Sequence, residues 1–212
     1  MPTLDETAAR IAACEDCPLS RGRLKTVPGE GPESAKIMLI GEAPGHNENQ
    51  QGRPFIGPAG KLLDDLLASI DLARADVFIT NVVKCRPPAN RDPQPEEISA
   101  CAHYLDDQIE QIKPRVIVTL GRYSMARYFP GEAISRVHGT TRHFTSRGRQ
   151  WTCFAMYHPA AALHNPQLKS TLISDMRKVP KIIEEIEEAA RKAATPPKDP
   201  EPPASAEQLS LF

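Results

Sequence analysis

The sequence of 212 residues predicts an α/β fold: a three-layer α/β/α sandwich around a central four-stranded parallel sheet. Four short apolar runs occur along the chain, each of the length of one buried strand. Stretches with the apolar spacing of amphipathic helices separate these runs. Such alternation of strands and helices is typical of a parallel sheet that is covered by helices on both faces.

The expected strands comprise residues 36–40, 77–83, 115–120 and 152–156. The first expected helix spans residues 59–69, in which four leucines share one face, and further helices are expected over residues 95–112 and 123–128. A last helix over residues 168–191 closes the domain, and Pro180 is expected to kink or interrupt it. Residues 1–191 therefore form one domain, because the chain is too short for two ordinary ones.

Composition and charge limit the classes of protein. The chain is 40% hydrophobic and 25% charged, and it has no apolar run of the length of a membrane span. The first residues lack a basic segment followed by an apolar one, so no secretory signal is expected. Five cysteines in a chain without an export signal indicate a reducing compartment, where clustered cysteines more often bind metal. We expect a cytoplasmic, nucleoid-associated protein with no membrane partner.

Positive charge is concentrated in one part of the chain, although the net charge is only −1. Residues 121–170 contain seven lysines and arginines against one acidic residue, Glu132. This pattern is compatible with contacts to phosphate groups, and equally with an ordinary solvated face.

Polar residues follow the expected strands at their carboxyl ends, where parallel sheets bind ligands. Glu42 follows the first strand, Asn81 lies in the second and His158 follows the fourth. We therefore expect one cleft to collect these three side chains. The segment after the first strand is rich in Gly and Pro and contains Glu48 and Phe55, which favours a binding site over a tight connection.

Four motifs occur in order along the chain: Gly-Glu-Ala-Pro-Gly at 41–45 with Glu48, Gly-Arg-Pro-Phe-Ile-Gly-Pro-Ala-Gly at 52–60, Thr-Asn-Val-Val-Lys-Cys-Arg-Pro-Pro at 80–88, and Tyr-His-Pro at 157–159. Together they resemble the family 4, or iron–sulfur, uracil-DNA glycosylases of bacteria and archaea. The resemblance spans residues 11–186. It implies a monofunctional enzyme of base excision repair that extrudes uracil from DNA and hydrolyses its N-glycosidic bond, leaving an abasic site.

The resemblance also implies roles for individual residues. Glu42 and His158 are the expected catalytic residues, acting on a water molecule and on the O2 atom of uracil respectively. Glu48 assists catalysis or closes the pocket against the methyl group of thymine. The expected substrate-binding residues are Gly41, Ala43, Phe55 and Asn81, with Phe55 stacking on the base and Asn81 pairing with its N3–H and O4.

The cysteines occur as Cys14-x-x-Cys17, Cys85 and Cys101, with Cys153 inside the fourth strand. Four separated thiolates suit either tetrahedral zinc or a [4Fe–4S] cluster, and the spacing alone does not choose between them. The resemblance implies a [4Fe–4S] cluster on these four positions. Cys153 is expected to be a small core residue.

Three residues are expected to contact DNA. Leu163 follows the catalytic histidine and suits either a wedge into the duplex or helix packing, while Arg136 and His138 are expected near the sugar-phosphate backbone. The expected partner is uracil-containing DNA, single- or double-stranded, bound by a monomer.

Residues 192–212 form a Pro-rich segment that is expected to be a disordered tail. Its end resembles the short peptide by which bacterial repair proteins dock on the sliding clamp, through Gln208, Leu209, Leu211 and Phe212. The alternative is that these apolar residues pack back onto the domain.

Two other functions compete with base excision. A nucleotide-binding hydrolase also uses Gly-rich strand–helix turns, but neither Gly-x-x-x-x-Gly-Lys-Ser/Thr nor Gly-x-Gly-x-x-Gly occurs in the chain. The second competitor is a non-catalytic, metal-stabilised module that binds damaged DNA. Release of uracil from DNA distinguishes the enzyme from both.

Overall fold

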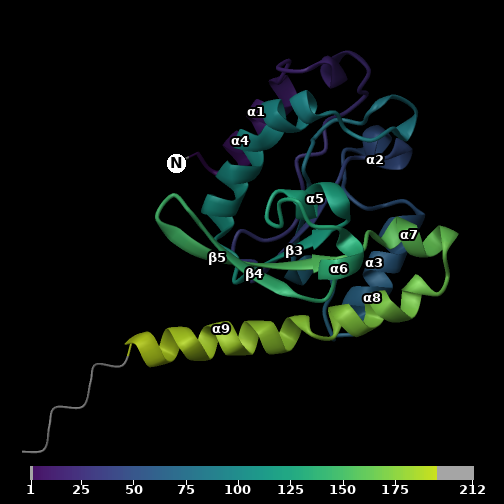
Figure 1. Ribbon diagram of the computed structural model, residues 1–212. Helices are drawn as coiled ribbons and strands as arrows, with labels where there is room; N and C mark the ends of the chain where they lie inside the picture. Colours follow the sequence, from purple (N-terminus) through teal and green to yellow (C-terminus); the bar gives the residue numbers. More distant parts are fainter. Residues whose placement is uncertain (1, 195–212) are drawn as a thin grey trace, which may run out of the picture.

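A five-stranded sheet with the strand order β2-β1-β3-β5-β4 forms the centre of the molecule in the computed structural model, which describes residues 2–194 (Figure 1). Its strands are β1 (Ile37–Gly41), β2 (Phe78–Asn81), β3 (Val116–Leu120), β4 (Thr141–Ser146) and β5 (Arg149–Met156). The strands β2, β1, β3 and β5 pair in parallel, whereas β4 pairs antiparallel with β5 at the edge.

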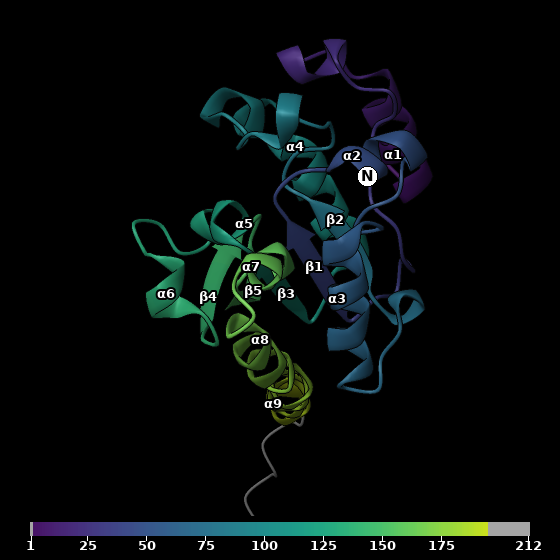
Figure 2. The same ribbon diagram turned by 90° about the vertical axis from the view of Figure 1, so that its right-hand side faces the viewer.

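Helices cover both faces of this sheet, so the expected α/β/α sandwich is confirmed (Figures 1 and 2). One apolar core joins the sheet to α1 (Leu4–Ala13), α4 (Pro95–Ile112), α5 (Arg122–Ala126) and α6 (Ile134–Val137). The other core joins the sheet to α3 (Pro58–Ala68), α7 (Pro159–His164), α8 (Leu168–Met176) and α9 (Val179–Ala194). The remaining short elements are α2 (His46–Gln51), η1 (Pro18–Arg21), η2 (Arg74–Asp76) and η3 (Pro88–Asn90).

The sheet contains one strand more than the four expected. The strand β4 alternates exposed and half-buried residues, so it carries no continuous apolar run from which it can be recognised. It is joined to β5 by a tight hairpin in which Arg147 and Gly148 both have positive φ angles, 49° and 76°. The strand β5 begins at Arg149, three residues before the expected start, because its first residues are exposed and polar and pair with β4 in this hairpin.

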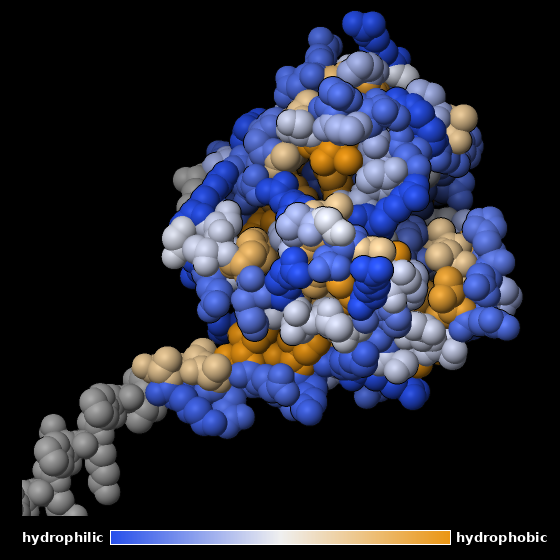
Figure 3. All heavy atoms as spheres, viewed as in Figure 1, coloured by the Kyte–Doolittle hydropathy of each residue, from blue (hydrophilic) through white to orange (hydrophobic). Residues whose placement is uncertain are grey.

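The helix expected over residues 168–191 is two helices, α8 and α9. The helical conformation is interrupted between Met176 and Val179. Pro180 therefore lies in the first turn of α9, where its missing N–H costs no hydrogen bond. Apolar side chains gather along α9 on the side that packs on the sheet, among them Ile182, Ile183 and Ile186 (Figure 3). The helix continues to Ala194, and the residues of the expected clamp peptide lie outside the described part of the chain.

The length and hydropathy of the helices show whether any of them could cross a membrane. Within residues 2–194, no helix combines the length and the apolar character that crossing a bilayer requires.

Candidate active site and cysteine site

A cavity of about 420 Å³ opens at the carboxyl ends of β1, β2 and β5. The side chains that sequence analysis assigned to catalysis and base binding lie around it: Glu42, Ala43, Glu48, Phe55, Asn81 and His158 all line this cavity. They come from five separate segments, which the parallel arrangement of the strands brings to one edge of the sheet.

Two rings form one wall of the cavity. The ring centroids of Phe55 and His158 are 5.5 Å apart, with an angle of 26° between the ring planes. The side chain of Phe55 is largely buried, with 6% of its surface exposed, and its ring is held by the core around α3. A planar ligand in this cavity therefore meets an aromatic face and an imidazole together.

The hydrogen bonds of His158 define its tautomer. Its Nδ1 atom accepts the main-chain N–H of Ala160 at 3.1 Å, in the first turn of α7. Since Nδ1 acts as an acceptor, the proton of the neutral ring is on Nε2. Burial disfavours the imidazolium and lowers the pKa of His158 to about 4, against a weaker opposing effect of Glu48. At neutral pH the ring is uncharged and has one N–H to donate.

Asn81 ends β2 as a polar residue with only 1% of its surface exposed. Its Oδ1 atom is buried and accepts no hydrogen bond from any described residue. Such an atom carries a desolvation cost that a ligand donor can remove. Gly41 makes room for this amide, because a Cβ atom at position 41 would lie 2.4 Å from Oδ1 of Asn81 and 2.5 Å from Cζ of Phe55.

Glu42 is the carboxylate nearest the end of β1. Its Oε1 atom accepts the main-chain N–H of Tyr123, at the start of α5, at 3.3 Å. Burial raises the pKa of Glu42, and the N–H groups of Tyr123 and Arg122 together with the charge of Arg122 only partly oppose this effect. A half-buried carboxylate with a raised pKa suits the activation of a water molecule.

Glu48 is bound to the main chain of the segment that carries Phe55. Its Oε1 atom accepts the N–H groups of Ile56 and Gly57, both at 2.9 Å. These bonds occupy one of its two carboxylate oxygens and tie α2 to the N-terminus of α3.

The three residues expected at DNA lie in different surroundings. Leu163 lines the cavity and exposes 48% of its surface. Arg136 is exposed on α6 and does not line the cavity. His138 also lies outside the cavity lining, and its Nδ1 atom is 2.7 Å from Oδ2 of the buried Asp175.

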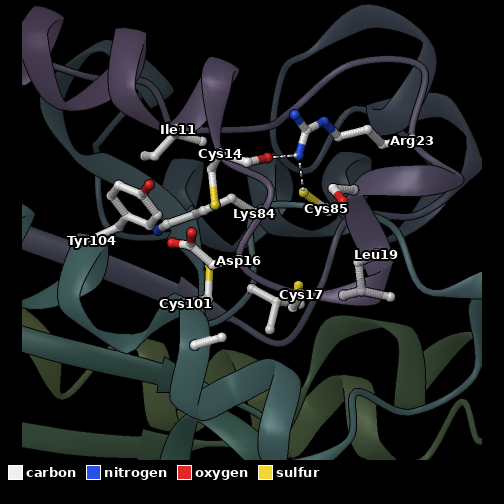
Figure 4. A pocket seen from close by; sticks show the side chains of 13 residues that line it. Ile11, Cys14, Asp16, Cys17, Leu19, Arg23, Lys84, Cys85, Cys101 and Tyr104 are labelled. Atoms are coloured by element: carbon white, nitrogen blue, oxygen red, sulfur yellow. Dashed lines mark hydrogen bonds between the residues drawn. The ribbon is translucent and has the colours of Figure 1, made fainter.

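A second, smaller cavity brings together the four cysteines that the sequence pattern singles out (Figure 4). Cys14 directly follows α1 and Cys17 precedes η1, Cys85 follows β2, and Cys101 lies on α4. All four are free thiols, and Arg23 donates to Sγ of Cys85 at 3.5 Å. In residues 2–194, no three His, Cys, Asp or Glu side chains converge on the position of a single metal ion. The fifth cysteine, Cys153, is fully buried in β5, as expected for a core residue.

Lys84 connects the two cavities. It lines the cysteine cavity, and its buried ammonium donates to Thr80 Oγ1 at 2.6 Å, to the main-chain oxygen of Asn81 at 2.8 Å and to Gln108 Oε1 at 2.7 Å. Since Gln108 lies on α4, as does Cys101, this lysine ties the helix of the cysteine site to the strand that ends in Asn81.

Several groups that hold the site carry no signal in the sequence. The main-chain N–H groups of Tyr123 and Ala160 bind Glu42 and His158, and Arg74 binds the segment around Phe55. None of these has a recognisable signal in the sequence, because each acts through a contact that only the folded chain creates.

Fold and cavity together define an α/β protein whose cavity combines an aromatic ring, a carboxylate and a neutral imidazole, the groups that a base-excising enzyme requires. The comparison with known families agrees with this class. The chain belongs to the uracil DNA glycosylase superfamily, whose family profile matches residues 28–182, and within it to the type-4 uracil-DNA glycosylases.

Relatives of that type cover most of the chain. A type-4 uracil-DNA glycosylase of Saccharolobus solfataricus is 49% identical over 84% of this chain and 86% of its own. Its counterpart in Archaeoglobus fulgidus is 47% identical over 84% of this chain and 92% of its own. The type-4 uracil-DNA glycosylase of Thermotoga maritima is 39% identical over 85% of this chain and 94% of its own. A type-5 uracil-DNA glycosylase of Thermus thermophilus is 39% identical but covers only 48% of this chain.

Proposed function

We propose that this protein is a monofunctional uracil-DNA glycosylase, which extrudes uracil from DNA and hydrolyses its N-glycosidic bond to leave an abasic site. The observation that supports this function most is that Glu42, Phe55, Asn81 and His158 line one cavity. The names of its relatives point to the same activity. We propose that it acts as a monomer, as the sequence analysis expects.

Recognition of uracil rests on Phe55 and Asn81. An extruded base loses its stacking neighbours in DNA, at a cost of a few kcal/mol, and the ring of Phe55 replaces one of them. The unpartnered Oδ1 of Asn81 accepts N3–H of uracil while its amide donates to O4. Cytosine presents an unprotonated N3 and an amino group at these places, so it leaves both groups of Asn81 without a partner.

Bond cleavage rests on His158 and Glu42. As the bond to the sugar breaks, negative charge collects on O2 of uracil, and the Nε2–H of the neutral His158 stabilises it. Ionised Glu42 orients a water molecule towards C1′, or stabilises the positive charge that develops there. The buried surroundings of both groups strengthen these interactions.

We further propose that Cys14, Cys17, Cys85 and Cys101 hold a [4Fe–4S] cluster. All four thiols line one cavity, and the resemblance of the sequence motifs to the iron–sulfur glycosylases favours such a cluster over zinc. The N–H of Arg23 beside Cys85 suits an anionic cluster. The bound cluster would supply a covalent link between α1, α4 and the loop after β2, and no step at the base.

The test of the activity is incubation with oligonucleotides that differ only in carrying U or T at one position. We expect alkali-labile abasic sites from the U strand and none from the T strand, and loss of the U product on Glu42→Gln. Binding of the U strand without cleavage would select a damage-binding module instead, and indifference to DNA would favour a nucleotide hydrolase.

The last five residues are proposed to bind the sliding clamp, through Gln208, Leu209, Leu211 and Phe212, as the sequence pattern predicts. Their deletion is expected to abolish clamp pull-down and to leave excision from naked DNA intact. Loss of excision or of folding on deletion would instead mean that these residues pack on the domain.

A further inference from the structure

The turn that carries Phe55 has an unfavourable backbone conformation. Phe55 has a φ angle of 51°, in the left-handed region that bulky residues rarely adopt. The first turn of α3 packs directly on this turn, since a Cβ atom at Gly60 would lie 1.8 Å from the main-chain oxygen of Phe55. Such a conformation persists only where the surroundings hold it.

Arg74 holds the two carbonyl groups of this turn. The residue lies on η2, 19 positions after Phe55, and its Nη1 atom donates to the main-chain oxygen of Phe55 at 2.9 Å. Its Nη2 atom donates to the main-chain oxygen of Pro54 at 2.6 Å. The planar fork of a guanidinium binds both oxygens at once, which a single ammonium cannot do with the same geometry.

Acidic side chains fix Arg74 in turn. Oε1 of Glu30 accepts from Nη2 at 2.6 Å and from Nε at 3.0 Å, and Oδ1 of Asp64 accepts from Nη1 at 3.2 Å. Burial opposes ionisation of Glu30, but Arg53 and Arg74 outweigh it and lower the pKa of its carboxyl group. Glu30 is therefore ionised at neutral pH and aligns the guanidinium.

Glu48 holds the opposite side of the turn by accepting the N–H groups of Ile56 and Gly57. Four main-chain groups of the segment 54–57 are thus bound by two side chains of opposite charge, Arg74 on the carbonyls and Glu48 on the N–H groups. Phe55 projects between these anchors into the cavity, whereas Arg74 does not line it.

We propose that Arg74 is a positioning residue of the base pocket. It keeps Phe55 in the strained conformation that presents its ring to the extruded base, and it does so without touching the substrate. This inference rests on the proposed function, in which the ring of Phe55 stacks on the extruded uracil.

The matched control is Arg53, which pairs with the same Glu30 through Nε at 2.8 Å but makes no hydrogen bond to the turn. We expect Arg74→Lys to lower the single-turnover rate of uracil excision about ten-fold, because the turn relaxes towards ordinary φ angles. The lysine retains a positive charge beside Glu30 and Asp64, so the variant folds even if Arg74→Met does not. Arg53→Met is expected to leave the rate within about two-fold of the unchanged protein.

A double-mutant cycle with Phe55→Ala separates positioning from general damage. In the Phe55→Ala background, Arg74→Lys should have no further effect on the excision rate, because the ring that it positions is absent. Binding to DNA that contains a preformed abasic site, where there is no base to stack, should be equal in all of these variants.

A ten-fold loss that persists in the Phe55→Ala background, or a matching loss of affinity for abasic DNA, would overturn the positioning role. The positioning role is also overturned if Arg74→Lys excises uracil at the normal rate while Phe55→Ala is impaired. If Phe55→Ala excises uracil normally, the proposed function of Phe55 fails, and the inference about Arg74 fails with it.

Discussion

Replacing Gly41 by alanine adds one methyl group between the two residues that are proposed to bind the base. The new Cβ atom would lie 2.4 Å from Oδ1 of Asn81 and 2.5 Å from Cζ of Phe55, whereas ordinary contacts begin at 3.4 Å. The amide and the ring must therefore move by about 1 Å, a displacement that costs about 100-fold in rate when it affects groups that position a reacting molecule. We expect uracil excision by Gly41→Ala to fall by about that factor.

The assay is single-turnover release of uracil with the enzyme in excess, together with thermal unfolding to measure stability. Gly22→Ala is the matched control, because a Cβ atom at position 22 has no atom within 4 Å and φ is not positive there. Its rate should equal that of the unchanged protein. If Gly41→Ala excises uracil within about three-fold of normal, the amide and the ring do not define the base site, and the reasoning is refuted.

The two titrating groups of the cavity and the four clustered cysteines can each be tested by substitution. Burial raises the pKa of Glu42, so excision should increase as the pH rises through a value above 4.5, and Glu42→Gln should lower the rate at least about 100-fold; an undiminished rate removes Glu42 from the mechanism. The pKa of His158 falls from 6.5 unfolded to about 4 folded, so the unfolded chain binds more protons between these values and the folded protein loses about 3 kcal/mol of stability as pH falls from 6.5 to 4. Urea unfolding across this range should show the slope, and His158→Ala should lack it; an equal slope in both proteins contradicts the buried neutral ring. Cys101→Ala should lose bound iron and brown colour while Cys153→Ala keeps both, and iron in neither protein would contradict the cluster.

The sequence predicted best what depends on apolar runs and on residues at strand ends. The helix expected over residues 95–112 has those bounds in the structure, and each of the four apolar runs overlaps a strand of one sheet, although the run 77–83 extends two residues beyond β2. Glu42, Asn81 and His158 meet at one cavity because parallel strands end at the same edge. The strand β4 was missed because half of its residues face solvent and its hairpin turn is Arg147-Gly148 rather than a more familiar pair.

Contacts between distant segments could not be predicted from apolar runs or from residues at strand ends. Nothing in the sequence near Arg74 indicates that its guanidinium binds the carbonyls of Pro54 and Phe55. The tautomer of His158 likewise depends on one main-chain N–H, that of Ala160, whose direction is set by the start of α7. These hydrogen bonds depend on how distant segments pack in three dimensions. The residues that line the cavity, by contrast, could be predicted from their types and their order along the chain.

Diffraction from crystals soaked with free uracil tests the proposed base site most directly. The ring is expected to lie parallel to that of Phe55, with its N3–O4 edge against the amide of Asn81 and its O2 atom within hydrogen-bond distance of Nε2 of His158. Uracil bound elsewhere, or bound in this cavity with its N3–O4 edge turned to solvent, would contradict the assignment of all three residues.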